Sequence, residues 1–289
     1  MPKLFYWIVI SCTIVTSLSI MSMQQNMSTK ELEQYFFNKN NWKTPDTLAD
    51  IKKIVESTDP QILKALRNLS GNTILHQAAE YGNDTILQVL INKISDKEWL
   101  NTINNQGDSA LIAAFFKKPL NITTVKILLQ NGINPNITSN DGQSALAWAA
   151  EVGTPDLIDL MVKNYNAHVN DNKFKLPPLI KAVFRYSLNN VKKLLELGAN
   201  PNSERDGRTA LYWAIYQWNN TSNELEKENA LKIAHTLLKN GADQKSQPFD
   251  RYQSPQMYWR SLGLNDNLEI DSTLQLKRFD SELRLISNV

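Results

Sequence analysis

Residues 140–166 read NDGQSALAWAAEVGTPDLIDLMVKNYN. The stretch opens with Asp141-Gly142, a turn dipeptide in which the glycine tolerates the positive φ of a tight turn. Apolar residues then recur at helical spacing up to Gly153, where we expect a first, short helix to end. A second helical pattern follows, formed by Leu157, Ile158, Leu160, Met161 and Val162. The stretch therefore predicts a turn, a short helix, a second turn and a longer helix.

The same pattern occurs five times along the chain. Each copy has a leucine near the start of its predicted first helix, and we call these five residues the anchor leucines. They are separated by 36, 35, 33 and 32 residues, and they are Leu75, Leu111, Leu146, Leu179 and Leu211. Several second helices run into a glycine where a left-handed residue closes a helix, at Gly132, Gly198 and Gly241. A period of this length is typical of an array in which each unit stacks on the next.

A hydroxyl residue begins the first helix in most copies. Thr73-Ile-Leu-His76 is close to the motif T-P-L-H-x-A, and later copies keep the hydroxyl at Ser109, Ser144 and Thr209. In the fourth copy Pro177 and Pro178 stand there instead and favour a rigid helix start. The chain thus resembles the ankyrin repeat over roughly residues 69–244. The resemblance implies an all-α fold, an ankyrin-repeat solenoid of about five repeats, and a hydrogen-bonding role for His76; a plain helical bundle is the alternative.

Both ends of the array need caps, because a terminal repeat has one face without a neighbour. We assign residues 28–69 to a helical N-terminal cap, residues 70–244 to the repeats and residues 245–289 to a C-terminal cap. Ser28 and Glu31 have the spacing of a capping box, and Thr44 is expected to begin a second helix. A third predicted helix begins at Asp59-Pro60 and carries Ile62, Leu63, Leu66 and Leu69.

Residues 1–27 have the charge layout of a targeting segment. Lys3 precedes a long uncharged stretch that continues to Lys30, and much of it is apolar. We favour a cleaved export signal, which places the protein in the periplasm or outside the cell. A retained signal anchor, with residues 4–27 spanning a membrane, is a second interpretation. A lipoprotein signal at Cys12 is a third.

Composition argues against several classes of partner and of chemistry. The net charge of +2 favours neither a nucleic acid nor an acidic substrate as partner. Cys12 is the only cysteine, so a mature chain cleaved after the signal has neither a disulfide nor a cysteine nucleophile. Asparagine is abundant, and we attribute this to genome composition rather than to chemistry.

No catalytic pattern emerges from the sequence. The three histidines, His76, His168 and His235, lie at unlike positions in different copies, so their spacing predicts no metal site. No nucleophile elbow and no glycine-rich phosphate loop precedes a helix. We therefore expect no enzyme activity, no cofactor and no metal, and a monomeric protein.

The resemblance implies that turn tips and first helices line a concave surface. The second and fifth positions after each anchor leucine are expected to face it, and they include several large aromatic residues. Together with one arginine these form the predicted partner-binding set, Phe116, Trp148, Phe184, Trp213, Tyr216 and Arg208. The other interpretation is that the aromatic residues wedge between successive helices as an enlarged core.

Three functions remain in view. The first, which we favour, is an exported module that binds a protein or peptide partner through the concave surface. The second is a secreted effector that acts in another cell with the same fold. The third is an enzyme for which the repeats dock the substrate, although segments of about 40 residues at either end are short for a catalytic domain.

Overall fold

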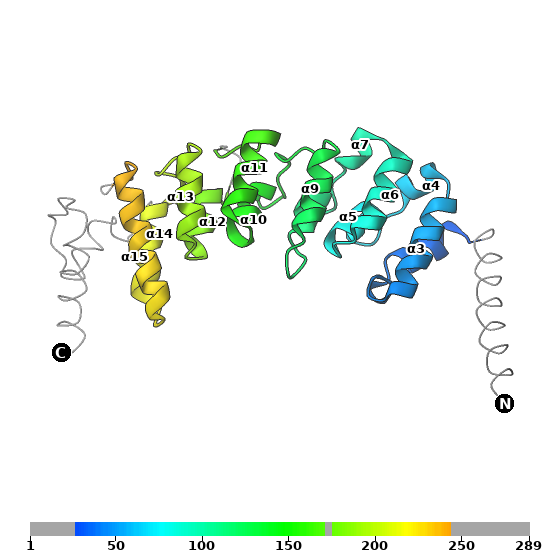
Figure 1. Cartoon of the computed structure of the whole chain (residues 1–289), viewed down its shortest axis with the longest axis horizontal. Helices are drawn as coiled ribbons and strands as arrows, with labels where there is room; N and C mark the ends of the chain where they lie inside the picture. Colours follow the sequence, from blue (N-terminus) through cyan, green and yellow to red (C-terminus); the bar gives the residue numbers. More distant parts are fainter. Residues whose placement is uncertain (1–26, 171–174, 244–289) are drawn as a thin grey trace, which may run out of the picture.

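The computed structural model describes residues 27–170 and 175–243. Its helical hairpins follow one another in a single row (Figure 1). A row of first helices contains α5 (Ile74–Glu80), α8 (Ala110–Ala114), α10 (Ala145–Val152), α12 (Pro178–Phe184) and α14 (Ala210–Asn220). A row of second helices contains α6 (Asp84–Ile94), α9 (Ile122–Gln130), α11 (Pro155–Tyr165), α13 (Leu188–Glu196) and α15 (Glu224–Lys239). Each helix packs against the next one in its own row and against its hairpin partner.

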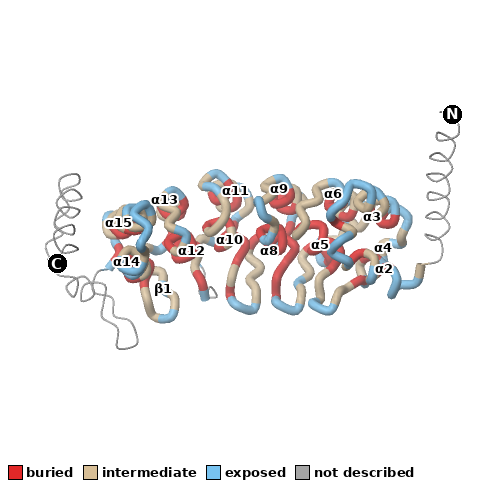
Figure 2. The backbone as a smooth tube through the Cα atoms, turned by 90° about the horizontal axis from the view of Figure 1, so that it is seen from below, coloured by how far each residue is buried: buried red, intermediate tan, exposed pale blue. Residues whose placement is uncertain are grey.

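Turns precede the first helices, and their tips are exposed along one edge of the molecule (Figure 2). In the fifth repeat the turn is a small antiparallel hairpin of β1 (Glu204–Arg205) and β2 (Arg208–Thr209). Single bridges stand at the equivalent places in the second and third repeats. Gly142 has a φ of 65°, which confirms the tight turn expected from the Asp-Gly pair.

Hydroxyl side chains start four of the first helices. Thr73, Ser109, Ser144 and Thr209 each accept a hydrogen bond from the backbone N–H three residues on. Such a cap stabilises a helix by about 1 kcal/mol. In the fourth repeat Pro177 holds the cap position without a side-chain bond, and α12 begins at Pro178 as predicted.

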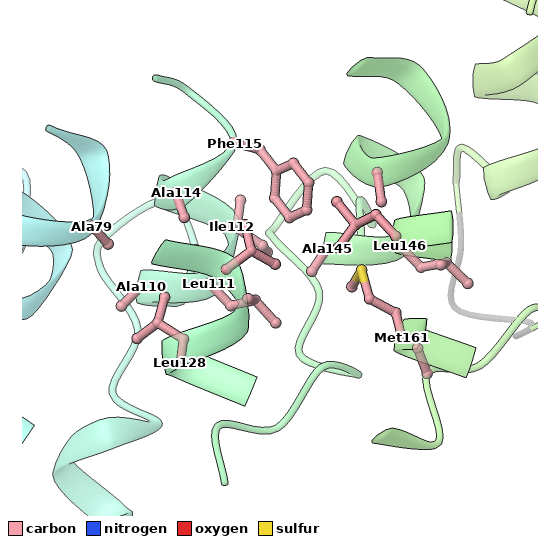
Figure 3. Packing of buried hydrophobic residues seen from close by; sticks show 14 of the residues in the cluster. Ala79, Ala110, Leu111, Ile112, Ala114, Phe115, Leu128, Ala145, Leu146 and Met161 are labelled. Carbon is pink, nitrogen blue, oxygen red and sulfur yellow. The ribbon is translucent and has the colours of Figure 1, made fainter. Parts of the chain in front are cut away.

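The anchor leucines form the centre of the contact between neighbouring repeats. All five are buried, with at most 1% of their surface exposed. Figure 3 shows Leu111 and Leu146 on adjacent first helices, with Leu128 and Met161 of the second helices close by. Alanines such as Ala114 surround them and let the helices approach closely. The leucines thus lie in a row instead of meeting at one centre, which favours the solenoid over a helical bundle.

His76 links the first repeat to the second. Its Nε2 lies 2.9 Å from the carbonyl oxygen of Asp108, which can only accept, so Nε2 carries the proton. Its Nδ1 therefore accepts from the Thr73 hydroxyl at 2.8 Å. Burial lowers the pKa of His76 to about 4, so the ring is neutral near pH 7. The hydrogen-bonding role implied by the resemblance is confirmed.

Asparagine side chains form a ladder between later repeats. Their amide nitrogens donate at 2.9, 2.8 and 3.3 Å to carbonyl oxygens of Asn166, Gly198 and Gly241. Their oxygens accept at 2.7, 2.9 and 2.7 Å from the backbone N–H groups of His168, Asn200 and Asp243. The residues of this asparagine ladder are Asn136, Asn170 and Asn202. Attributing asparagine to genome composition alone was therefore wrong, because these three amides join successive repeats.

The N-terminal cap contains α2 (Thr29–Phe36), η1 (Lys39–Trp42), α3 (Pro45–Ser57) and α4 (Pro60–Ala65), and α3 packs on α6 at the end of the second-helix row. The capping box of Ser28 and Glu31 and the cap at Thr44 are as predicted. The placement of Leu69 was wrong, because α4 ends at Ala65 and Leu69 is fully exposed at the next turn.

Between the first and second repeats, α7 (Lys97–Leu100) carries Trp99 and Leu100, and both side chains are buried. In the fifth repeat, residues 218–229 form an insertion between the helices, and α14 and α15 are longer than the corresponding helices of the other repeats. The predicted export segment, apart from Met27, and the predicted C-terminal cap lie outside the described residues. Within residues 27–170 and 175–243, no helix has the length and apolar character that crossing a bilayer requires.

The buried, neutral His76 predicts a stability that depends on pH. The unfolded chain takes up a proton as the pH falls below 6.5, whereas the folded protein does not until about pH 4. The free energy of unfolding should therefore decrease by on the order of 3 kcal/mol as the pH falls through this interval. We expect His76→Gln to be less stable than the wild type at pH 7.5, with the difference narrowing toward pH 4 in urea titrations. A difference that stays constant with pH would contradict this assignment.

Candidate interaction surface

The face formed by the turn tips and the first helices carries the predicted aromatic residues, and we call it the inner face. Phe116 and Tyr216 each have 41% of their surface exposed. Trp148, Phe184 and Trp213 are half-buried and pack against the core. The structure thus contains elements of both interpretations made from the sequence. The aromatic residues extend the core, and part of each remains open to solvent.

Phe116 and Trp148 form a first cluster, which we call the N-terminal cluster. Phe116 follows α8, and its ring meets that of Trp148 in α10 edge to face, with centroids 5.3 Å apart and planes at 80°. The ammonium of Lys181, in α12, lies 4.0 Å from the centre of the Trp148 ring. Lys181 also forms an ion pair with Glu151. The ion pair of Glu151 and Lys181 therefore lies beside this cluster, where the third repeat meets the fourth.

Phe184, Tyr212, Trp213 and Tyr216 form the C-terminal cluster. Phe184 ends α12, and its ring meets that of Trp213 edge to face, with centroids 5.0 Å apart and planes at 81°. The Tyr216 ring lies 5.8 Å from the Trp213 ring, one helical turn further along α14. Tyr212 lies beneath them with only 5% of its surface exposed. Edge-to-face pairs of this kind contribute about 0.5–1.5 kcal/mol beyond the area they bury.

Two arginines of the hairpin in the fifth repeat stack on the C-terminal cluster. The guanidinium of Arg205 lies 5.4 Å from the centre of the Phe184 ring, and that of Arg208 lies 5.5 Å from the Trp213 ring. Arg205 also pairs with Asp206 at 3.2 Å. A guanidinium over an aromatic ring gains about 0.5–1 kcal/mol and loses part of its freedom. The hairpin therefore holds two guanidinium groups in a fixed place beside the aromatic residues.

The predicted continuous strip is divided in two. The pair formed by Glu151 and Lys181 occupies the inner face between the clusters, and no aromatic contact joins Trp148 to Phe184 among the described residues. Lys181 is largely buried, with 8% of its surface exposed, although its position was expected to line the concave surface. Toward the N-terminus the equivalent positions hold Gln77 and Ala113, which are also buried.

Sequence reasoning placed the six predicted residues on one face but missed three of their neighbours. Tyr212 directly follows the anchor leucine of its repeat, as His76 does in the first repeat. This position therefore indicated a buried residue and not a member of the aromatic cluster. Arg205 was not among the predicted residues, because its position over Phe184 depends on how the hairpin folds back. The role of Lys181 follows from the repeat spacing, which brings it beside Trp148 and Glu151.

Comparison with known proteins decides the family. The family profile for ankyrin repeats, which describes three copies, matches residues 46–139 and 146–248 of this chain. The chain belongs to the ankyrin-repeat family. Ankyrin repeats are protein-interaction modules. The match begins within the segment that the sequence assigns to the N-terminal cap, where α3 already occupies the second-helix row.

Individual ankyrin proteins give more distant matches. A putative ankyrin repeat protein of Acanthamoeba polyphaga mimivirus is 28% identical over 152 residues, which are 52% of this chain and 19% of that protein. The nuclear factor NF-kappa-B p105 subunit of Gallus gallus is 26% identical over 200 residues, which are 65% of this chain and 19% of the subunit. This chain therefore matches about a fifth of the length of either relative.

A solved structure shows the same arrangement of ankyrin repeats. The ankyrin repeat domain of Bcl-3, a member of the IkappaB protein family, superposes with a TM-score of 0.55 at 22% sequence identity. The superposition covers 75% of this chain and 93% of that one. At this identity the likeness establishes the ankyrin fold alone.

Potential metal ligands are scattered over the described part of these ankyrin repeats. In residues 27–170 and 175–243, no group of three or more potential metal ligands comes together. His76 is buried between repeats, His168 is exposed in a linker and His235 is half-buried on α15. What the inner face offers is aromatic surface and positioned positive charge.

Lys181 is expected to hold the N-terminal cluster in place. Its replacement in Lys181→Ala removes the cation over Trp148 and leaves the half-buried Glu151 carboxylate without its partner. We expect the free energy of unfolding to fall by about 1–3 kcal/mol, measured by urea titration. Lys192→Ala, at an exposed lysine of α13, is the control and should change it by less than about 0.5 kcal/mol. Equal effects of the two substitutions would show that the Lys181 contacts are not stabilising.

Proposed function

We propose that this chain is an exported, non-catalytic module that binds a protein or an extended peptide through its inner face. Phe116, Trp148, Phe184, Trp213 and Tyr216 supply the contact area. Arg208, held beside Trp213, places a guanidinium group at the C-terminal cluster. The binding mechanism is recognition by a preformed surface, without a chemical step.

The observation that carries this proposal is the pair of partly exposed aromatic clusters. Aromatic residues and arginine are the residue types that most often dominate binding energy at protein interfaces. Ring contacts and core packing already restrict these side chains, so little conformational entropy remains to be lost on binding. The stacked repeats hold both clusters on one scaffold, because each first helix is packed against the next.

Export is the second part of the proposal, and it rests on the sequence of residues 1–27. The charged start and the apolar stretch that follows favour a cleaved signal, with delivery to the periplasm or the outside of the cell. Anchoring by residues 4–27 and action as an effector inside another cell are the alternatives. N-terminal sequencing of the protein from its native host separates a cleaved signal from a retained anchor, and the location of a tagged protein identifies an effector.

The binding role predicts a selective loss on truncating exposed aromatic side chains. We expect the double variant Phe116→Ala/Tyr216→Ala to fold normally, because both side chains are the exposed members of their clusters. Used as bait in affinity purification, it should recover the main partner of the wild type at a level reduced roughly tenfold or more.

The matched control for this experiment is Ile62→Ala. Ile62 is a large apolar residue of α4 with 39% of its surface exposed, close to the 41% of Phe116 and Tyr216, but it belongs to the N-terminal cap. Partner recovery should be unchanged in this variant. If the aromatic double variant recovers every partner as well as the wild type does, the inner face is not the binding surface.

A further inference from the structure

The two aromatic clusters share one construction. In each, the residue five positions after an anchor leucine meets, edge to face, the tryptophan two positions after the next anchor leucine. The first pair is Phe116 with Trp148, and the second is Phe184 with Trp213. Their centroid distances are 5.3 and 5.0 Å and their interplanar angles 80° and 81°. The same apolar feature therefore occurs twice on the inner face, two repeats apart.

The spacing of the clusters sets a length for what binds them. Neighbouring packed helices lie about 8–10 Å apart, so two repeats correspond to roughly 16–20 Å. The first helices α8, α10, α12 and α14 follow one another in a row, so this step is taken along the molecule (Figure 2). An extended peptide advances about 3.3 Å per residue and points alternate side chains to the same face. Six residues, an even number, span about 20 Å and return a side chain to the same face.

The surface between and beside the clusters is charged. Glu151 and Lys181 pair with each other between the clusters, and because Lys181 is largely buried, a ligand passing there meets mainly the Glu151 carboxylate. At the C-terminal cluster, Arg205 and Arg208 stack on the rings, while Asp206 pairs with Arg205. Exposed Arg185, directly after Phe184, adds a third cation there. Glu204 is the other carboxylate of the hairpin, so the described residues 185 and 204–208 hold three arginines and two carboxylates.

We propose that the inner face binds an extended, acidic peptide segment with two large apolar side chains six residues apart. One apolar side chain contacts Phe116 and Trp148, and the other contacts the C-terminal cluster. A carboxylate next to the second apolar residue contacts the guanidinium of Arg205. This inference rests on the proposed binding function and adds the chemistry and spacing of the ligand.

A library of displayed random 15-residue peptides tests the spacing. The probe library is panned on the immobilised full-length protein, and enriched peptides are synthesised. We expect enriched peptides with two large apolar residues at positions i and i+6 and an Asp or Glu beside one of them. Moving the second apolar residue to i+3 in the best peptide should weaken its binding roughly tenfold or more in fluorescence anisotropy.

Variants of the protein assign the two contacts. Phe116→Ala and Tyr216→Ala should each weaken binding of the best peptide, whereas Ile62→Ala should leave it unchanged. Arg205→Gln should weaken binding and reduce its dependence on salt, with Lys192→Gln, at an exposed lysine on α13, as the control. Circular dichroism melts of the variants verify that each is folded.

The outcomes separate this inference from the proposed function. One outcome is that enriched peptides depend on Phe116 or Tyr216 and yet carry only one large apolar residue, or bind equally well with i+3 spacing. Such peptides would contradict a ligand with two apolar contacts, whereas binding through the inner face would still hold. If the enriched peptides lack Asp and Glu and bind Arg205→Gln as tightly as the wild type, the proposed contact between a ligand carboxylate and Arg205 is wrong. Binding that neither aromatic variant affects, or no enrichment over a blank surface, contradicts both proposals.

Discussion

A single ankyrin hairpin of this chain cannot bury its own apolar residues, so every repeat depends on contact with its neighbours. The anchor leucines show this dependence, since helices of adjacent repeats cover each of them and at most 1% of the surface of each is exposed. Burying a leucine side chain stabilises a fold by about 1.5–3 kcal/mol. Hydrogen bonds between repeats, through His76 at one end and the asparagine ladder further along, fix the register of the stack.

This constraint separates the parts of the sequence that build the stack from the parts that are free to bind. Positions next to the anchor leucines are occupied by small or aliphatic residues in most repeats. Positions two and five residues further on vary from alanine to tryptophan, because they lie toward the inner face. Apart from Tyr212, the members of the aromatic clusters stand at these variable positions, on a frame that is held by other residues. Recognition can thus change without altering the fold, which is why the fold by itself identifies no partner.

The repeating elements were predictable from sequence because their signals are local and occur in phase. Hydroxyl caps such as Thr73 and closing glycines such as Gly132 mark where each helix begins or ends, and the structure confirms them. The asparagine ladder was missed because its partners are backbone groups about 30 to 40 residues away, which composition does not reveal. Leu69 was misplaced because α4 stops early, and an apolar pattern alone does not show where a helix ends.

The candidate site was predictable as a set of residues but not as an arrangement. Helical spacing put Trp148 and Trp213 on the same face, and the structure agrees. Sequence did not show that Lys181 would be buried beside Trp148, since a lysine at such a position is normally solvated. The stacking of Arg205 on Phe184 depends on the three-dimensional path of a hairpin, which spacing does not determine.

Native-state hydrogen exchange, followed by mass spectrometry, tests most directly whether the repeats are stabilised by their neighbours in single file. The substitution Leu146→Ala removes the central anchor leucine and is expected to cost about 2–5 kcal/mol. Because stability in a linear array is transmitted through nearest neighbours, exchange should accelerate most in α10, then in α8 and α12, and least in α5 and α14. Equal acceleration in all five helices would indicate one shared core and contradict this account.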